Sequence, residues 1–309
     1  MKLGIAVVYL VRDDSEVLLR LHLDRIRRHT SVPYAIHGTA LRLPRPFHHY
    51  LDARNIRLHQ LSGPTEVLAH IEHSWFLTQL LQRALDDGCS HLATLHVDSF
   101  PIADHWAQQL AASLSPQVPV TAVMEPMEGD TMARPNLAGM MALAEFWRES
   151  RPSLIPTPEL EKTAEWRRFI ERHQQGVVHS GVGLGYRLEQ TGKTWAPILR
   201  TNSRRRHPVL AGVYGDKIFH LGAATRAKHF FTNPVPVSET AAMRLRRGLA
   251  ATVRRILPAS IRRIFRPLRP LGNFYDERPL RTNERIYSEI RRELFVDPDH
   301  FLDQTRHDR

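Results

Sequence analysis

The stretch HLATLHVDSFP, residues 91–101, combines a strand pattern with polar side chains near its end. Residues 92–97 are mostly apolar or β-prone, which predicts a buried strand that Pro101 stops. Upstream, residues 72–87 predict a helix, and Gly88 is placed to end it. A helix that leads into a central strand is typical of an open α/β sheet, in which ligands bind at the carboxyl ends of the strands.

His96 and Asp98 stand at this carboxyl end. A carboxylate oxygen is a ligand that Mg²⁺ or Mn²⁺ takes, and diphosphate groups bring such ions with them. The two side chains therefore predict a metal-assisted diphosphate site. The alternative is a polar strand end in which Asp98 caps the following turn, and spacing alone leaves both interpretations open.

The composition fits a globular α/β protein. The chain has 309 residues, 42% of them hydrophobic, which is enough for one large domain or for one domain with an appendage. The only cysteine, Cys89, excludes an intrachain disulfide and a cysteine-based zinc site. Because we see neither a signal peptide nor a membrane-spanning run, we expect a cytoplasmic protein.

The order of strand and helix patterns predicts the fold class. Strand patterns at residues 3–11, 34–41, 55–61 and 118–124 alternate with helix patterns at residues 16–28 and 104–114. This order predicts an α/β fold with a mostly parallel sheet flanked by helices. Further along, we expect a loop at 125–135, helices at 136–147 and 159–173, and strands at 197–202 and 209–221.

The C-terminal part is strongly basic. The net charge is +11, and residues 241–275 contain nine arginines and no acidic residue. From Ala241 to Leu268, apolar residues at helical spacing face arginines, which predicts an amphipathic helix that binds an anionic membrane from the cytoplasmic side. An ordinary surface helix with solvated arginines is the alternative, and the lack of interleaved aromatics disfavours nucleic acid. We therefore divide the chain into residues 1–235, a catalytic domain, and residues 236–309, a basic helical extension.

Several motifs in residues 1–225 resemble those of GT-A fold glycosyltransferases of the family 2-like group. YLVRDDSEVLLRLHLDRI resembles the opening strand and nucleotide-binding loop of that family. HSWFLTQLLQRALDDGCSHLATLHVDSFP resembles its helix, strand and metal motif, and GYRLEQTGKTW resembles the segment in which a strand re-enters the sheet. The resemblance implies a GT-A-like sheet.

The resemblance also implies an activity and its residues. It implies transfer of a sugar, of the hexosyltransferase type, from a nucleotide-diphosphate sugar to an acceptor hydroxyl, with inversion and with Mn²⁺ or Mg²⁺. The ion would bind His96, Asp98 and His220. The nucleotide sugar would contact six residues, Tyr9, Val11, Asp14, Thr39, His96 and Asp98.

The chain departs from the family pattern at two functional positions. His96 replaces the first acid of the aspartate–any–aspartate motif, and a neutral imidazole suits Mn²⁺ better than Mg²⁺. No carboxylate stands where the family has its catalytic base. His179 is the nearest titratable residue there, with Glu145, Asp130 and Glu128 as substitutes, unless His179 is simply a buried structural histidine. A catalytically degenerate or polyanion-binding protein is therefore the alternative function.

Two other nucleotide-binding patterns are incomplete. The run from Gly181 to Gly185 lacks the full spacing of a dinucleotide-binding loop and comes late in the chain. Residues 9–14 supply no glycine-rich turn of the kind that a methyltransferase uses for its cofactor. The basic loop from Arg204 to His207 suits diphosphate oxygens or is a solvated turn.

Overall fold

A computed structural model describes residues 1–10, 16–41, 43, 45–51, 56–64, 69–124, 134–173, 180–207, 209–222 and 277–309. The chain divides into two compact units, one of Met1–Arg226 with Ile290–Arg309 and one of Ala227–Glu289. The sequence led us to assign everything after residue 235 to an extension, whereas the end of the chain belongs to the unit that holds the sheet.

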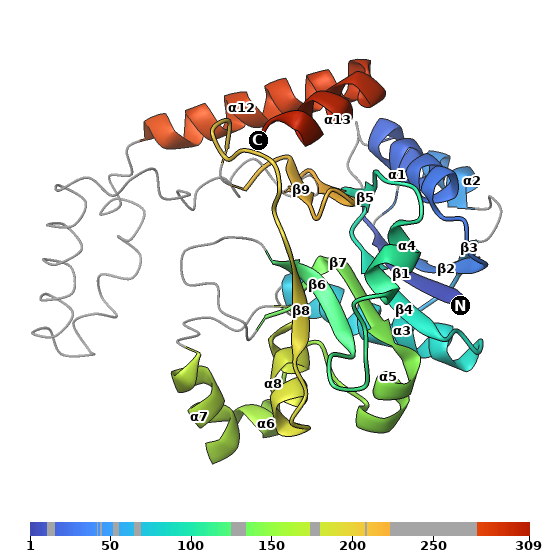
Figure 1. Cartoon of the computed structure of the whole chain (residues 1–309), viewed down its shortest axis with the longest axis vertical. Coiled ribbons are helices and arrows are strands. Elements are labelled where there is room, and N and C mark those ends of the chain that lie inside the picture. Colours follow the sequence, from blue (N-terminus) through green and yellow to red (C-terminus); the bar gives the residue numbers. More distant parts are fainter. Residues whose placement is uncertain are drawn as a thin grey trace, which may run out of the picture. The chain divides into compact units, whose positions relative to one another are not determined.

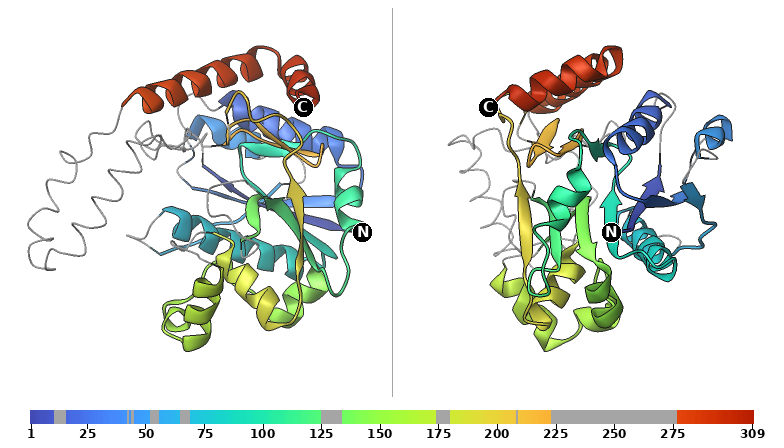
Figure 2. Two further views of the ribbon diagram at one scale, coloured as in Figure 1. Left: turned by 60° about the vertical axis from the view of Figure 1, so that its left-hand side comes forward. Right: turned by 45° about the vertical axis from the view of Figure 1, so that its right-hand side comes forward.

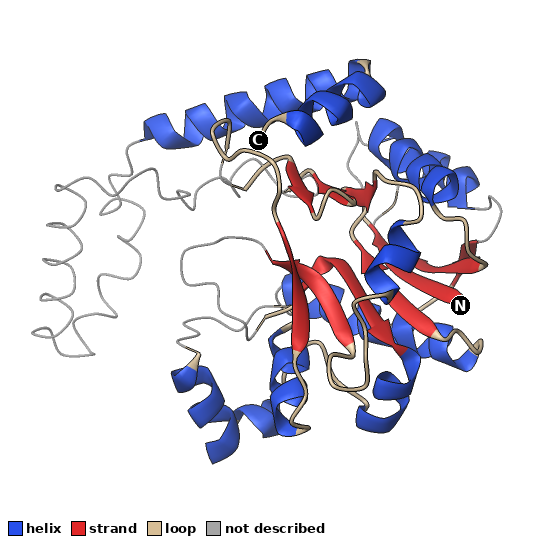
Figure 3. Ribbon diagram, in the orientation of Figure 1, coloured by secondary structure: helices blue, strands red, loops and turns tan. Residues whose placement is uncertain are grey.

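The centre of this unit is a seven-stranded sheet in the order β3-β2-β1-β4-β7-β6-β8 (Figures 1 and 3). Neighbouring strands are parallel except at β7, which runs antiparallel to both β4 and β6. The mostly parallel α/β sheet that the sequence predicts is thus confirmed. The strands are β1 (Leu3–Tyr9), β2 (Tyr34–Ala40), β3 (Ile56–Leu58), β4 (His91–Leu95), β6 (Val120–Met124), β7 (Asn136–Leu143) and β8 (Trp195–Leu199).

Helices cover both faces of the sheet, and each face has its own cluster of buried apolar residues (Figure 2). On one face the cluster joins α1 (Glu16–His29) and α4 (Trp106–Ala111) to β1, while on the other it joins α3 (Ala69–Asp86), α5 (Ala144–Ser150) and α8 (Val182–Gln190). Two-sided burial explains why the central strands are continuous apolar runs. Among the described residues, the other helices are a 3₁₀ helix (Arg45–Phe47), α2 (His48–Leu51), α6 (Pro158–Glu161), α7 (Ala164–Arg172), α12 (Glu277–Val296) and α13 (Pro298–His307).

A second, three-stranded antiparallel sheet has the order β5-β10-β9, with β5 (Ser99–Pro101), β9 (Gly212–Tyr214) and β10 (Ile218–His220). The prediction of one strand over 209–221 is wrong, because a tight turn splits it into the β9–β10 hairpin. Gly215 and Asp216 both have φ of 57°, and the Lys217 amide donates to the Tyr214 carbonyl at 3.0 Å. Positive φ at both Gly215 and Asp216 gives a tight turn whose twist suits antiparallel strands, and the pairing of Tyr214 with Ile218 leaves three residues in the connection.

Other predicted elements also need correction. Residues 136–147 are not one helix, because residues 136–143 form β7, whose side chains are buried on both faces and so show no alternation. The GYRLEQ segment belongs to α8 rather than to a strand, and the helix expected over 159–173 is two helices. Strand β4 ends at Leu95, and Pro101 lies in the separate strand β5.

Two predicted segments cannot be compared with the structure. The basic segment 241–268 and most of the loop 125–135 lie outside the described residues. Among the described residues, no helix is long and apolar enough to cross a membrane.

Candidate metal centre

The turn after β4 carries two of the predicted ligands and is fixed by Ser99. The Ser99 hydroxyl accepts a hydrogen bond from the His96 amide at 2.8 Å and donates one to the Ala138 carbonyl of β7. The Ser99 amide in turn donates to the His96 carbonyl at 2.9 Å. The positions of His96 and Asp98 therefore follow from the main sheet rather than from a solvated loop.

The third predicted ligand, His220, reaches this turn through the small sheet. In the antiparallel pairing of β10 with β5, His220 lies opposite Ser99. The next residue, Leu221, donates its amide to the Asp98 carbonyl at 2.9 Å. The backbone pairing of two short strands thus brings a late residue to the carboxyl end of β4.

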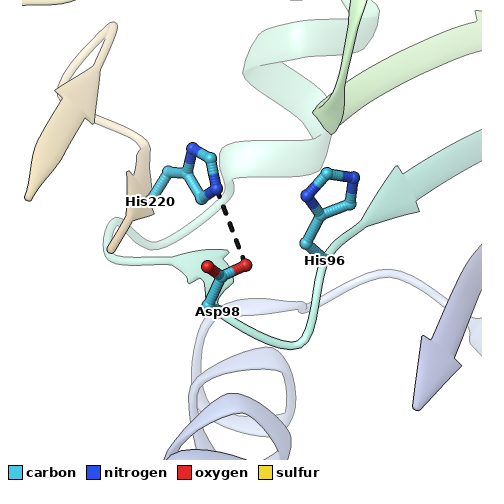
Figure 4. Close-up of side chains that lie close together, drawn as sticks. All are labelled: His96, Asp98 and His220. Carbon is cyan, nitrogen blue, oxygen red and sulfur yellow. Dashed lines mark ion pairs between the residues drawn. The ribbon is translucent and has the colours of Figure 1, made fainter. Parts of the chain in front are cut away.

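His96, Asp98 and His220 form one cluster, in which ligand atoms of all three lie within 4.8 Å of one another (Figure 4). His220 Nε2 lies 3.6 Å from Asp98 Oδ1, and the two imidazole ring centroids are 5.7 Å apart. The Asp98 carboxylate and the His220 ring are both buried. Two atoms bound to one ion at about 2.1 Å lie no more than about 4.2 Å apart, so small side-chain rotations suffice to complete a site.

The chemistry of the three side chains determines which ions they suit. Two neutral imidazoles and one carboxylate suit Mn²⁺, Zn²⁺ and similar transition metals, whereas Mg²⁺ prefers oxygen ligands alone. A bound cation would add favourable charge beside the buried Asp98 carboxylate, since burial of a charge is costly unless it is compensated. The residues therefore fit a divalent transition-metal ion.

Two histidines near the cluster escaped sequence reasoning. On α3, the His73 ring meets the His96 ring edge to face, with centroids 4.8 Å apart. On α1, the Nδ1–H of His22 donates to the Ser99 carbonyl at 2.9 Å. Burial lowers the pKa of His22 to about 4, although the Ser99 carbonyl and the nearby Asp98 charge act in the opposite direction. The imidazole of His22 is therefore neutral near pH 7 and holds the ligand-bearing turn.

The sequence pattern could have singled out His22 as a residue with a structural role, but it contains nothing that singles out His73. His22 falls among the apolar positions of an amphipathic helix, where a polar residue is unusual and needs a partner. The place of His73 beside His96 depends on how α3 packs against the sheet, which no local pattern specifies.

Of the predicted nucleotide contacts, Tyr9 and Thr39 lie near the carboxyl ends of their strands, the same end of the parallel strands at which the cluster lies. Tyr9 is the last residue of β1, and Thr39 pairs with Val8 near the end of the adjacent parallel strand β2. Both side chains are buried, and burial raises the pKa of the Tyr9 hydroxyl. Val11 and Asp14 lie outside the described residues.

The two predicted bases are not brought to the cluster by any described contact. Glu145 is exposed in the first turn of α5, which follows the carboxyl end of the antiparallel strand β7. Because Leu143 pairs with His91, the first residue of β4, Glu145 lies near the amino end of β4, whereas His96 follows its carboxyl end. The other predicted base, His179, lies outside the described residues, as do Glu128 and Asp130.

The glycine run packs closely against neighbouring backbone, and the basic loop forms an ion pair with α12. A Cβ atom on Gly183 would lie 2.6 Å from the Ser153 carbonyl oxygen, so this glycine permits close backbone packing. In the basic loop, Arg206 forms a two-pronged ion pair with Glu293 at 2.6 and 2.7 Å.

No protein-family model matches the sequence, and no curated protein matches it significantly. Solved structures similar to this chain include GT-A-type glycosyltransferases, the class that the sequence resembles. The galactosyltransferase LgtC in complex with donor and acceptor sugar analogs is 16% identical, with 66% of this chain and 74% of that chain covered and a TM-score of 0.38.

Two further structures show the same degree of similarity. Mouse xyloside xylosyltransferase 1, in its apo form, is 10% identical over 63% of this chain and 85% of that chain, with a TM-score of 0.39. TarS of S. aureus in complex with UDP-GlcNAc is 11% identical over 52% of this chain and 51% of that chain, with a TM-score of 0.35. At these identities and TM-scores, the function has to be argued from the site itself.

Proposed function

We propose that the protein is a glycosyltransferase that moves a sugar from a nucleotide-diphosphate sugar to an acceptor hydroxyl with the help of a divalent metal ion. The observation that carries this proposal is the cluster of His96, Asp98 and His220 at the carboxyl end of β4. In an open α/β sheet, ligands are expected to bind at the carboxyl ends of the strands. The family resemblance of the motifs around these residues supplies the reaction type.

The cluster suits the diphosphate end of such a donor. A bound divalent ion supplies positive charge that offsets the negative charge developing on the diphosphate as the sugar–phosphate bond breaks. Asp98 and the two histidines would hold that ion, with Mn²⁺ as the preferred choice and Mg²⁺ as the weaker one. Tyr9 and Thr39, at the same edge, would contact the nucleotide, and Val11 and Asp14 remain predicted contacts.

His179 is our candidate for the base that deprotonates the acceptor hydroxyl, which then attacks the anomeric carbon with inversion. The support is the neighbouring residue Ser180, whose hydroxyl accepts a hydrogen bond from Ser74 at 2.8 Å. Ser74 follows His73, the residue whose ring meets His96. Histidine is the side chain that most often serves as a general base at neutral pH.

The proposal extends to the location of the protein. The basic segment from Ala241 to Leu268 would hold the enzyme at the inner face of an anionic membrane. The eight arginines between residues 241 and 268 support this assignment.

The test is a thermal-shift panel of nucleoside diphosphates, each with and without Mn²⁺, on the wild type and on Asp98→Asn. A ligand that binds only the folded state raises the melting temperature by mass action. We expect one nucleotide to raise it in the presence of Mn²⁺, and the substitution to abolish this shift. Glu149→Gln, exposed on α5, is the matched control and keeps the shift.

A panel that is flat for every nucleotide would reject the donor site. The alternative function, a degenerate glycosyltransferase-like or polyanion-binding protein, would then account for the basic segment better. A shift without turnover of any nucleotide sugar would retain the binding site and reject the transferase activity.

A further inference from the structure

The last helix of the chain, α13, packs against the small sheet that carries His220. Asp297 caps α13 by accepting a hydrogen bond from the His300 amide at 3.1 Å, and Pro298 occupies its first turn. Phe301 and Leu302 on this helix are both 4% exposed. Figure 1 shows α13 in red near β9 and α1, in the same compact unit as the two sheets.

Three phenylalanine rings connect α13 to the two strands next to the metal ligands. The ring of Phe301 meets the ring of Phe219 at nearly a right angle with centroids 6.1 Å apart, and Phe219 meets Phe100 at 5.2 Å. Phe219 lies opposite Phe100 in the β10–β5 pairing, just as His220 lies opposite Ser99. Because successive side chains of a strand point to opposite faces, the ligand His220 and the aromatic contact with α13 occupy the two faces of one short strand.

An ion pair connects the same helix to α1. Asp299 Oδ1 lies 2.7 Å from Arg25 Nη2 and 3.1 Å from Arg28 Nη1, and the Arg25 side chain is 9% exposed. The hydrogen bond from Arg25 lowers the pKa of the Asp299 carboxyl. One turn before Arg25 on α1 is His22, which holds the Ser99 carbonyl of the ligand-bearing turn. Helix α13 therefore contacts β10, which carries His220, and it also contacts α1, which holds the turn that carries His96 and Asp98.

We propose that α13 is a clamp that sets the position of His220 relative to Asp98, with Phe301 and Asp299 as its positioning residues. This inference rests on the proposed function in so far as it takes the cluster to be a metal centre. Its physical basis is that the small sheet has strands of three residues each, shorter than the usual length of about 5–6, so its position depends on what packs against it, including Phe301 of α13. Residues that orient ligands typically change metal affinity about 10–100-fold when they are substituted.

The experiment compares Mn²⁺ affinity, measured by electron paramagnetic resonance of the free ion, among variants of the full chain. Phe301→Ala should weaken Mn²⁺ binding about tenfold or more, and Asp299→Asn should weaken it by a smaller factor. The controls are Phe146→Ala, a buried ring on α5 at the opposite edge of the sheet, and Asp303→Asn, an exposed carboxylate on α13 itself. Both controls should bind Mn²⁺ within about twofold of the wild type.

A second measurement needs no metal. The imidazole ¹H and ¹⁵N signals of His220 in the metal-free protein report its position directly. We expect them to shift or broaden in Phe301→Ala and to return toward wild type in Phe301→Tyr, which restores the ring. Wild-type Mn²⁺ affinity together with unchanged His220 signals in Phe301→Ala would overturn the clamp. A wild type that binds no Mn²⁺ rejects the metal centre instead, and the His220 signals then still confirm or overturn the clamp.

Discussion

The Nε2 atom of His220 lies 3.6 Å from Oδ1 of Asp98, although the two residues come from different parts of the chain. Their separation is set by backbone pairing, because His220 is opposite Ser99 and the Leu221 amide donates to the Asp98 carbonyl. A ligand that both side chains share must therefore bind where the carboxyl end of β4 meets the small sheet. This places the proposed metal centre on strand ends that are held from two sides.

Replacing His220 with Gln should weaken Mn²⁺ binding about 100-fold or more, because the loss of a ligand exceeds the 10–100-fold effect of residues that merely orient one. Titration calorimetry with Mn²⁺ measures this. His91→Gln is the matched control, since His91 begins β4 at the far end of the same strand. Equal losses in both variants would show that the effect is on folding rather than on coordination.

Replacing His96 with Asp should move the metal preference from Zn²⁺ and Mn²⁺ toward Mg²⁺. The substitution supplies the second carboxylate of the aspartate–any–aspartate motif, and Mg²⁺ prefers oxygen ligands. We expect the ratio of Mg²⁺ to Zn²⁺ affinity to rise about tenfold, measured by competition titration. His96→Asn removes the imidazole without adding charge. If it changes the ratio as much as the Asp variant, ligand charge is not the cause.

The sequence was sufficient for the elements whose burial pattern is simple. Strands β1, β2 and β4 are short apolar runs because helices cover both of their faces, and α1 and α3 are amphipathic because one side of each packs on the sheet. The polar residues that interrupt such a run stand out, which is why His96 and Asp98 were identified.

The rest depends on tertiary structure. Strand β7 is buried on both faces and contains good helix formers, so its apolar residues fit either period until its pairing with β4 and β6 is known. His220 became a candidate through the family resemblance and because it ends a strand pattern just before Gly222, but no local pattern links it to Asp98. The contacts of His73 with His96 and of Phe301 with Phe219 arise from elements that are distant in sequence.

Replacing Gly183 with Ala should destabilise the protein by about 1–3 kcal/mol. Ala is intrinsically better than Gly in a helix by about 1 kcal/mol, but the new Cβ atom would lie 2.6 Å from the Ser153 carbonyl oxygen and 2.8 Å from the Ile155 carbonyl carbon. These are backbone atoms and cannot rotate away. Urea denaturation measures the change, with Gln190→Ala at the exposed end of α8 as the control. A variant of normal stability that loses nucleotide binding would instead favour a phosphate-binding role for this glycine.

His37 should make the protein less stable in mild acid. It is fully buried on β2, with its Nδ1 3.2 Å from His59 Nε2 and its own Nε2 3.2 Å from Asp87 Oδ2. Burial lowers the pKa of His37 to about 4; Asp87 opposes this effect, while His59, Arg57 and Lys2 reinforce it. The folded protein therefore binds the proton more weakly than the unfolded chain, whose histidine has a pKa near 6.5.

The sign of the pH effect follows from this difference. Stability that depends on neutral His37 is fully present above about pH 6.5 and is lost as the pH falls toward 4, up to on the order of 3 kcal/mol. Urea denaturation of the wild type and of His37→Asn at pH 7 and pH 5 measures the effect, and the variant should lose less stability between the two pH values. His22 has a similarly lowered pKa and contributes to both proteins, so it cancels in the comparison. An equal loss in both proteins would mean that His37 is already protonated, or that its charge is stabilised by Asp87, in the folded state.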